Sequence, residues 1–142
     1  MAFAAQTGET AQLAWLVFGT ALIWAVIYDT FYAMVDRADD LKVGVKSTAI
    51  LFGDADLFVI GGLQALMLLA LTFVGRMAEL GLWYFLSLLL AAILMGWHQW
   101  LARDRQPAGC FAAFRNNHII GLIIFIGIVL HYTFTPQVAV TG

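Results

Sequence analysis

The chain has 142 residues, of which 63% are hydrophobic and 11% are charged, and its mean hydropathy is +0.89. Soluble domains carry a charge on about a quarter of their residues, so this composition indicates an integral membrane protein. The net charge of −2 and the sequence motifs give no support to nucleic-acid binding. The single cysteine, Cys110, cannot form a disulfide within the chain.

Four continuously apolar stretches follow one another, at residues 13–34, 57–74, 80–101 and 119–134. A spanning helix needs about 20 residues, so the last stretch would be short unless its helix begins near Phe111. Backbone groups in lipid must be paired within the segment, which favours helices, and continuously apolar runs argue against a β-barrel. We therefore predict one all-α membrane domain over residues 1–142, a polytopic bundle with about four spanning helices.

The connectors between these stretches differ in charge. Basic residues gather in the first and third connectors: Arg37, Lys42, Lys46, Arg103, Arg105 and Arg115. The second connector holds only Arg76, and no basic residue follows the fourth stretch. By the positive-inside rule, we expect the first and third connectors to be cytoplasmic and both ends of the chain to lie outside.

Small and polar residues add predictions about packing. Glycines in or beside the apolar stretches are expected to let helices approach closely: Gly61, Gly62, Gly75, Gly81 and Gly96. Residues 107–109, Pro-Ala-Gly, predict a turn in the third connector. His98 lies between Trp97 and Trp100, which indicates an aromatic cluster at the membrane interface.

The segment from Tyr28 to Asp40 is the most informative, because it places four aspartates at the end of an apolar stretch. Acidic groups at a membrane boundary are costly to bury and indicate a functional site. If the helix continues to Asp40, at about 100° per residue, the acids and two tyrosines share a sector of roughly 120°. These residues are Tyr28, Asp29, Tyr32, Asp36, Asp39 and Asp40. Gly44 is expected to end the helix.

This sector has the chemistry of a metal–diphosphate site. Asp36 and Asp40 lie one helical turn apart, with Asp39 as a third candidate, and Mg²⁺ is held by one or two carboxylates together with substrate phosphates. Basic groups that follow are candidates for neutralising a diphosphate: Arg37, Lys42 and Lys46.

Aromatic residues lie just deeper along the same stretch, where their faces can stabilise a developing carbocation: Tyr28, Phe31 and Tyr32. The alternative is a solvated, internally paired loop beside an interfacial belt of tyrosines. Asp29 argues against that alternative, because a solvated loop does not explain an acid so far inside the apolar stretch.

The run from Tyr28 to Gly53 resembles the second aspartate-rich motif of the UbiA superfamily of intramembrane prenyltransferases. It reads Tyr-Asp-Thr-x-Tyr-Ala-Met-x-Asp-Arg-x-Asp-Asp and then Gly-x-Lys-Ser-Thr-Ala-x-Leu-Phe-Gly. Within that superfamily it is most similar to the members that prenylate 4-hydroxybenzoate. A later stretch, Cys110-Phe111-x-Ala-Phe-x-Asn-Asn, extends the resemblance over nearly the whole chain.

The resemblance implies transfer of a polyprenyl group from polyprenyl diphosphate to the ring of 4-hydroxybenzoate, ortho to the hydroxyl, in ubiquinone biosynthesis. It implies Mg²⁺ at Asp36 and Asp40 and a partial UbiA-type fold in a bacterial inner membrane. Tyr28, Asp29 and Tyr32 are the candidates for catalytic groups.

Members of the superfamily also carry a first motif, Asn-Asp-x-x-Asp-x-x-x-Asp, which does not occur in these 142 residues. We therefore expect the chain to correspond to a C-terminal half that is inactive without a complementary N-terminal half. Three alternatives remain open at this point. Two copies could pair to rebuild a site, a related enzyme could use another acceptor, or a non-catalytic membrane protein could bind prenyl diphosphates or divalent ions.

Overall fold

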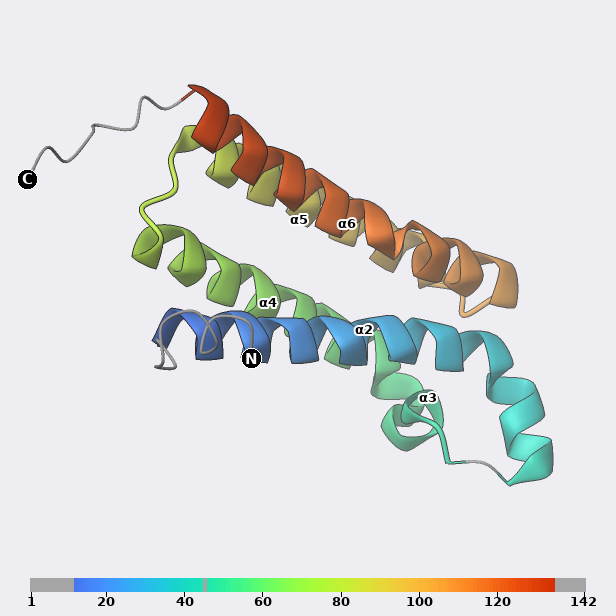
Figure 1. The fold of residues 1–142 in the computed structure, drawn as a ribbon. Coiled ribbons are helices and arrows are strands. Elements are labelled where there is room, and N and C mark those ends of the chain that lie inside the picture. Colours follow the sequence, from blue (N-terminus) through green and yellow to red (C-terminus); the bar gives the residue numbers. More distant parts are fainter. Residues whose placement is uncertain (1–11, 45, 135–142) are drawn as a thin grey trace, which may run out of the picture.

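The computed structural model describes residues 12–44 and 46–134, and these residues are helical apart from short connectors (Figure 1). The elements are α2 (Gln12–Val43), α3 (Thr48–Phe52), the 3₁₀ turn η1 (Gly53–Ala55), α4 (Asp56–Met77), α5 (Leu82–Ala102) and α6 (Pro107–Phe134). Within these described residues, four helical segments are long and apolar enough to cross a membrane: α2, α3 together with α4, α5 and α6. The predicted all-α bundle with four spanning helices is confirmed.

The long helices run up and down and form a closed set of neighbours. Helix α4 packs beside α2 and α5, and α6 packs beside α5 and α2. The α2–α4 connector and the α5–α6 connector lie at one end of the bundle, and the α4–α5 connector lies at the other (Figure 1). The first and third connectors therefore share a side, as their charge predicts, and their cytoplasmic location stays a prediction.

The ends of the helices follow local chemistry. Gly44 ends α2 with a φ of 79°, a left-handed conformation that glycine adopts at low cost. The turn predicted at residues 107–109 is wrong, because these residues form the first turn of α6. Proline is favoured at the first helical position, where its missing N–H is not needed. The fourth span is consequently 28 residues long rather than short.

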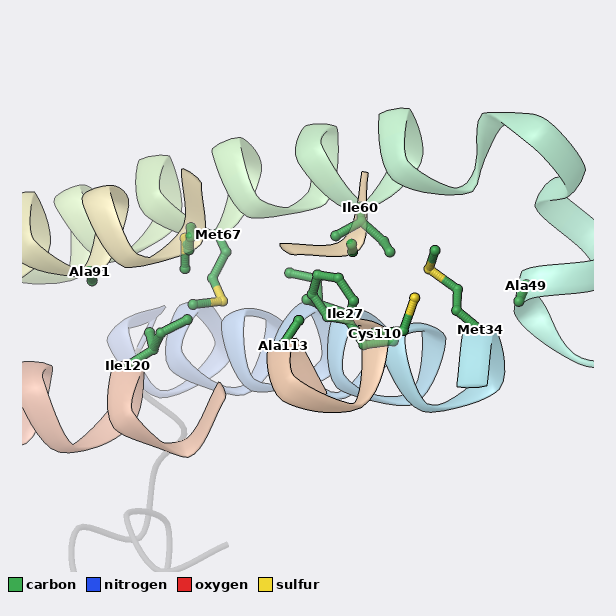
Figure 2. Packing of buried hydrophobic residues seen from close by; sticks show 12 residues of the cluster. Ile27, Met34, Ala49, Ile60, Met67, Ala91, Cys110, Ala113 and Ile120 are labelled. Carbon is green, nitrogen blue, oxygen red and sulfur yellow. The ribbon is translucent and has the colours of Figure 1, made fainter. Parts of the chain in front are cut away.

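The core lies between the four helices and is built from small, sulfur-containing and branched side chains (Figure 2). Gly75 packs directly beneath the ring of Tyr84, as predicted for a close-packing glycine. The same prediction is wrong for Gly62 and Gly96, because a Cβ at either position would meet no atom within 4 Å.

Several polar groups inside the spans are paired across helices. Gln99 donates to Gln64 over 3.0 Å, linking α5 to α4, and the Tyr84 hydroxyl donates to the Leu71 carbonyl oxygen over 2.8 Å. At the end opposite the acidic segment, the Gly81 N–H donates to Nδ1 of His131 over 2.9 Å. Such pairing matters in lipid, where water is not there to satisfy a polar group.

Candidate active site

Helix α2 continues through the whole acidic segment, as the predicted sector requires. One face of the helix packs into the bundle, with Ile27 1% exposed, Phe31 fully buried and Met34 4% exposed. The predicted site residues lie on the other side and are exposed or half-buried: Tyr28, Asp29, Tyr32, Asp36, Asp39 and Asp40. The packing of α2 therefore leaves much of this face of the helix uncovered by the described residues.

Asp36 and Asp40 are half-buried, and neither carboxylate makes a hydrogen bond or ion pair with another described residue. Two unpaired carboxylates one helical turn apart fit Mg²⁺, which commonly takes one or two protein carboxylates and completes its shell with phosphate and water. Within residues 12–44 and 46–134 no three His, Cys, Asp or Glu side chains gather into a metal site. The chain thus offers part of a coordination shell.

Asp39 and Lys42 form a separate pair on the surface. The Lys42 Nζ lies 2.9 Å from Asp39 Oδ1, and the two side chains are 74% and 79% exposed. An ion pair this exposed adds little stability, so Lys42 can exchange its partner for a phosphate. Lys46 is also exposed and makes no ion pair with a described residue.

Arg37, unlike Lys42 and Lys46, is paired with a buried carboxylate. Its Nη1 donates to Asp56 Oδ2 over 3.2 Å, which ties α2 to the start of α4. Sequence reasoning missed Asp56, whose side chain is fully buried and also paired with Arg105. The hydrogen bond from Arg105 to this carboxylate raises the pKa of the guanidinium above its usual value.

Tyr28 and Tyr32 lie against one phenylalanine of α6. Their ring centroids are 4.3 and 5.1 Å from that of Phe114, and Phe111 extends the cluster at 6.1 Å. Phe31 was predicted on the same surface, and this is wrong, because its ring is buried and packs edge-on to His98. Phe114 joins the predicted tyrosines through tertiary packing alone.

Asp29 lies two helical turns deeper along α2 than Asp36, and its side chain is exposed. It lines a cavity of about 270 Å³ together with Ala21, Trp24, Ala25 and Tyr28. Trp24 and Ala21 also line a neighbouring cavity of about 250 Å³ between α2, α4 and α6, whose other walls are almost entirely apolar. Along α2, the polar surface at Asp29 therefore adjoins an apolar groove.

The chain was compared with known proteins. The family model described as the UbiA prenyltransferase family matches residues 1–129. The chain belongs to the UbiA prenyltransferase family. Proteins named 4-hydroxybenzoate octaprenyltransferase are similar to it: that of Pseudomonas aeruginosa strain UCBPP-PA14 is 54% identical over 132 residues, and that of Hahella chejuensis is 52% identical over 136 residues. No solved structure matches the chain.

This UbiA-family chain spans about half the length of the curated relatives it matches. The alignments cover 93% of the chain and 45% of the Pseudomonas protein, and 96% of the chain and 45% of the Hahella protein. The family resemblance expected from the motif is thereby confirmed.

The UbiA-family chain also buries two polar side chains whose place sequence reasoning did not predict. His98 is fully buried and its ring contacts Trp97, as an aromatic cluster predicts, while the location of that cluster at the membrane interface stays a prediction. Asn117 on α6 is fully buried as well. The side-chain nitrogens of His98 and both amide atoms of Asn117 have no hydrogen-bond partner among the described residues. A single histidine or asparagine within a helix gives no local signal for such burial.

Proposed function

We propose that this chain forms part of a Mg²⁺-dependent prenyltransferase that moves a polyprenyl group from its diphosphate to 4-hydroxybenzoate in ubiquinone biosynthesis. The order of groups along α2 carries this proposal. The carboxylates Asp36 and Asp40 lie at the connector end, Tyr28 and Tyr32 follow deeper, and an apolar groove continues beyond them. A lipid diphosphate has the same order, with a charged head and an apolar chain.

The connector end would bind the head group. Asp36 and Asp40 would hold Mg²⁺, and Lys42 and Lys46 would bind the phosphate oxygens that Mg²⁺ leaves free. The chemistry that Mg²⁺ supplies when bound is neutralisation of the charge that develops on the departing diphosphate. Arg37 would bind the diphosphate only if its guanidinium contacted the diphosphate and Asp56 at the same time.

The deeper groups would act on the reacting carbon and the acceptor ring. The faces of Tyr28 and Tyr32, set by Phe114, can stabilise positive charge on the allylic carbon. The ring then forms a carbon–carbon bond to that carbon and must lose a proton. Among the described aspartates of α2, Asp29 lies deepest, so we assign it to binding the acceptor or taking this proton.

The uncovered face of α2 favours a second protein segment over lipid. A charged side chain inside a span is costly in lipid and lies instead against protein or a polar cavity. Asp29 is exposed on this face, and the chain spans 45% of its Pseudomonas relative. We therefore propose that the part of the family not represented in these residues covers this face and supplies further ligands. We expect the 142 residues alone to be inactive, with both site connectors on the cytoplasmic side of a bacterial inner membrane.

The test is prenyl transfer in membranes. The chain is expressed alone and with the N-terminal half of the Pseudomonas aeruginosa relative, and given a labelled polyprenyl diphosphate, Mg²⁺ and 4-hydroxybenzoate. We expect product from the combination and none from the chain alone. Product from the chain alone would support pairing of two copies. Mg²⁺-dependent binding without product, or product only with another aromatic acceptor, would contradict the proposed reaction.

Substitutions at Tyr28 separate its ring from its hydroxyl. If the aromatic face acts, Tyr28→Phe should retain most of the activity, whereas Tyr28→Leu should lose on the order of tenfold, as expected when a cation–π contact of about 1–2 kcal/mol is removed. Tyr132→Leu is the matched control, because Tyr132 is an exposed tyrosine near the C-terminal end of α6. Equal losses in Tyr28→Phe and Tyr28→Leu would assign the role to the hydroxyl instead.

A further inference from the structure

The carboxylate of Asp56 is a buried junction between three elements. It lies at the start of α4 and is fully buried. Arg37 from α2 reaches Oδ2 at 3.2 Å, and Arg105 from the α5–α6 connector reaches Oδ1 at 2.9 Å through Nη2. The Leu57 N–H donates to Oδ1 over 2.7 Å. Both oxygens are thus engaged, and loss of the charge would leave two guanidinium groups without their shared partner.

Arg105 is held in a conformation that its backbone does not favour. Its φ is 50°, in the left-handed region. Its Nε donates to Asp56 Oδ1 over 3.0 Å, and its Nη2 donates to the main-chain oxygen of Asp54 over 2.7 Å. A strained residue persists where its surroundings fix it, and such residues concentrate at functional sites. The bonds to residues 54 and 56 are what fix this one.

The two elements that Asp56 joins are the two that carry the candidate site. Arg37 directly follows Asp36 on α2, about 100° around the helix from Asp36 and about 60° from Asp40. Arg105 lies two residues before α6, whose Phe114 contacts Tyr28 and Tyr32. The same carboxylate therefore connects the acidic turns of α2 with the start of the helix that supports the tyrosines.

We propose that Asp56 is a positioning residue for the metal–diphosphate site. Through Arg37 and Arg105 it fixes the last turns of α2 against the start of α6, and so holds Asp36 and Asp40 in the orientation that a shared cation requires. This inference rests on the function proposed above. Some residues do not bind a metal themselves but orient the side chains that do. Replacing such a residue commonly changes the metal affinity, although every ligand is still present.

The first measurement is the Mg²⁺ dependence of prenyl transfer by the chain combined with the N-terminal half of its relative. Asp56→Asn should raise the half-saturating Mg²⁺ concentration on the order of tenfold. Asp54→Asn is the matched control, since its fully exposed carboxylate lies 3.9 Å from Arg37 Nη2, an exposed pair that adds little stability, and Arg105 bonds to its main-chain oxygen. It should leave the Mg²⁺ requirement unchanged. Activity of Asp56→Asn that falls only with the amount of folded protein, at an unchanged Mg²⁺ requirement, would overturn the proposal.

The second measurement uses the 142-residue chain alone in lipid nanodiscs and does not depend on activity. Amide hydrogen exchange of residues 36–43 should become faster in Asp56→Asn, while exchange in the middle of α5 stays as in the unmodified chain. Uniform acceleration in every helix, or no change at all, would overturn the proposal. If Asp56→Asn does not accumulate, Arg105→Lys, which keeps the charge and loses the paired donors, should give the same selective change. If the combined halves are inactive but Asp56→Asn still gives this selective acceleration, only the proposed function is refuted.

Discussion

Replacing Asp36 or Asp40 by asparagine should reduce prenyl transfer by the combined halves on the order of a hundredfold or more, because charge stabilisation of the leaving diphosphate would be lost. Both side chains are half-buried and free of ion pairs with described residues, so their negative charge serves no evident structural purpose. The measurement is initial rate at saturating polyprenyl diphosphate and Mg²⁺. Asp39→Asn should lose less, because Asp39 is 79% exposed and already paired with Lys42.

Asp104→Asn is the control for this series. Asp104 is an exposed aspartate in the α5–α6 connector, and its carboxylate contacts Arg103 at 3.4 Å. Its substitution should leave the rate unchanged. Near-normal rates in both Asp36→Asn and Asp40→Asn would remove the basis for placing a metal-bound diphosphate on this face of α2.

Gly109→Ala should destabilise the helical hairpin of α5 and α6. A Cβ at residue 109 would overlap the main-chain oxygen of Leu101, which is part of α5 and cannot move aside as a flexible side chain can. Overpacking of this kind costs about 1–3 kcal/mol. The measurement is the free energy of unfolding in mixed micelles, followed by circular dichroism. The loss should also lower the yield of active protein from the combined halves.

Gly96→Ala gives the matched comparison within α5. A Cβ there meets nothing within 4 Å, so the change should be neutral or stabilising by up to about 1 kcal/mol, from the higher helix propensity of alanine. Equal destabilisation by the two substitutions would mean that the close approach of Gly109 to Leu101 does not govern the stability of the hairpin.

The membrane fold and the acidic face followed from local sequence features. Apolar runs of spanning length predicted the four spans, and the four-residue recurrence from Tyr28 to Asp40 predicted one face of a helix. Both signals depend on neighbouring residues and on fixed helical geometry. The end of α2 at Gly44 was equally local, since it depends on the conformational freedom of a single residue.

The residues that support this face were not predictable in the same way. Asp56 meets Arg37 across 19 positions and Arg105 across 49, and no sequence spacing encodes such a meeting. Phe114 joins Tyr28 only because α6 packs beside α2. The turn predicted at residues 107–109 failed for a different reason, because proline both breaks helices and begins them, and the sequence alone does not distinguish the two.

The central claim is that the half-buried carboxylates Asp36 and Asp40 of α2 hold the cation that binds the diphosphate. Iron-mediated backbone cleavage tests it most directly. In the combined halves, Fe²⁺ replaces Mg²⁺, and ascorbate with peroxide cuts the chain next to the bound metal. We predict cleavage within residues 36–40 that requires a prenyl diphosphate and is lost in Asp36→Asn and Asp40→Asn. Cleavage confined to other segments, or cleavage at 36–40 that persists in both variants, would contradict the claim.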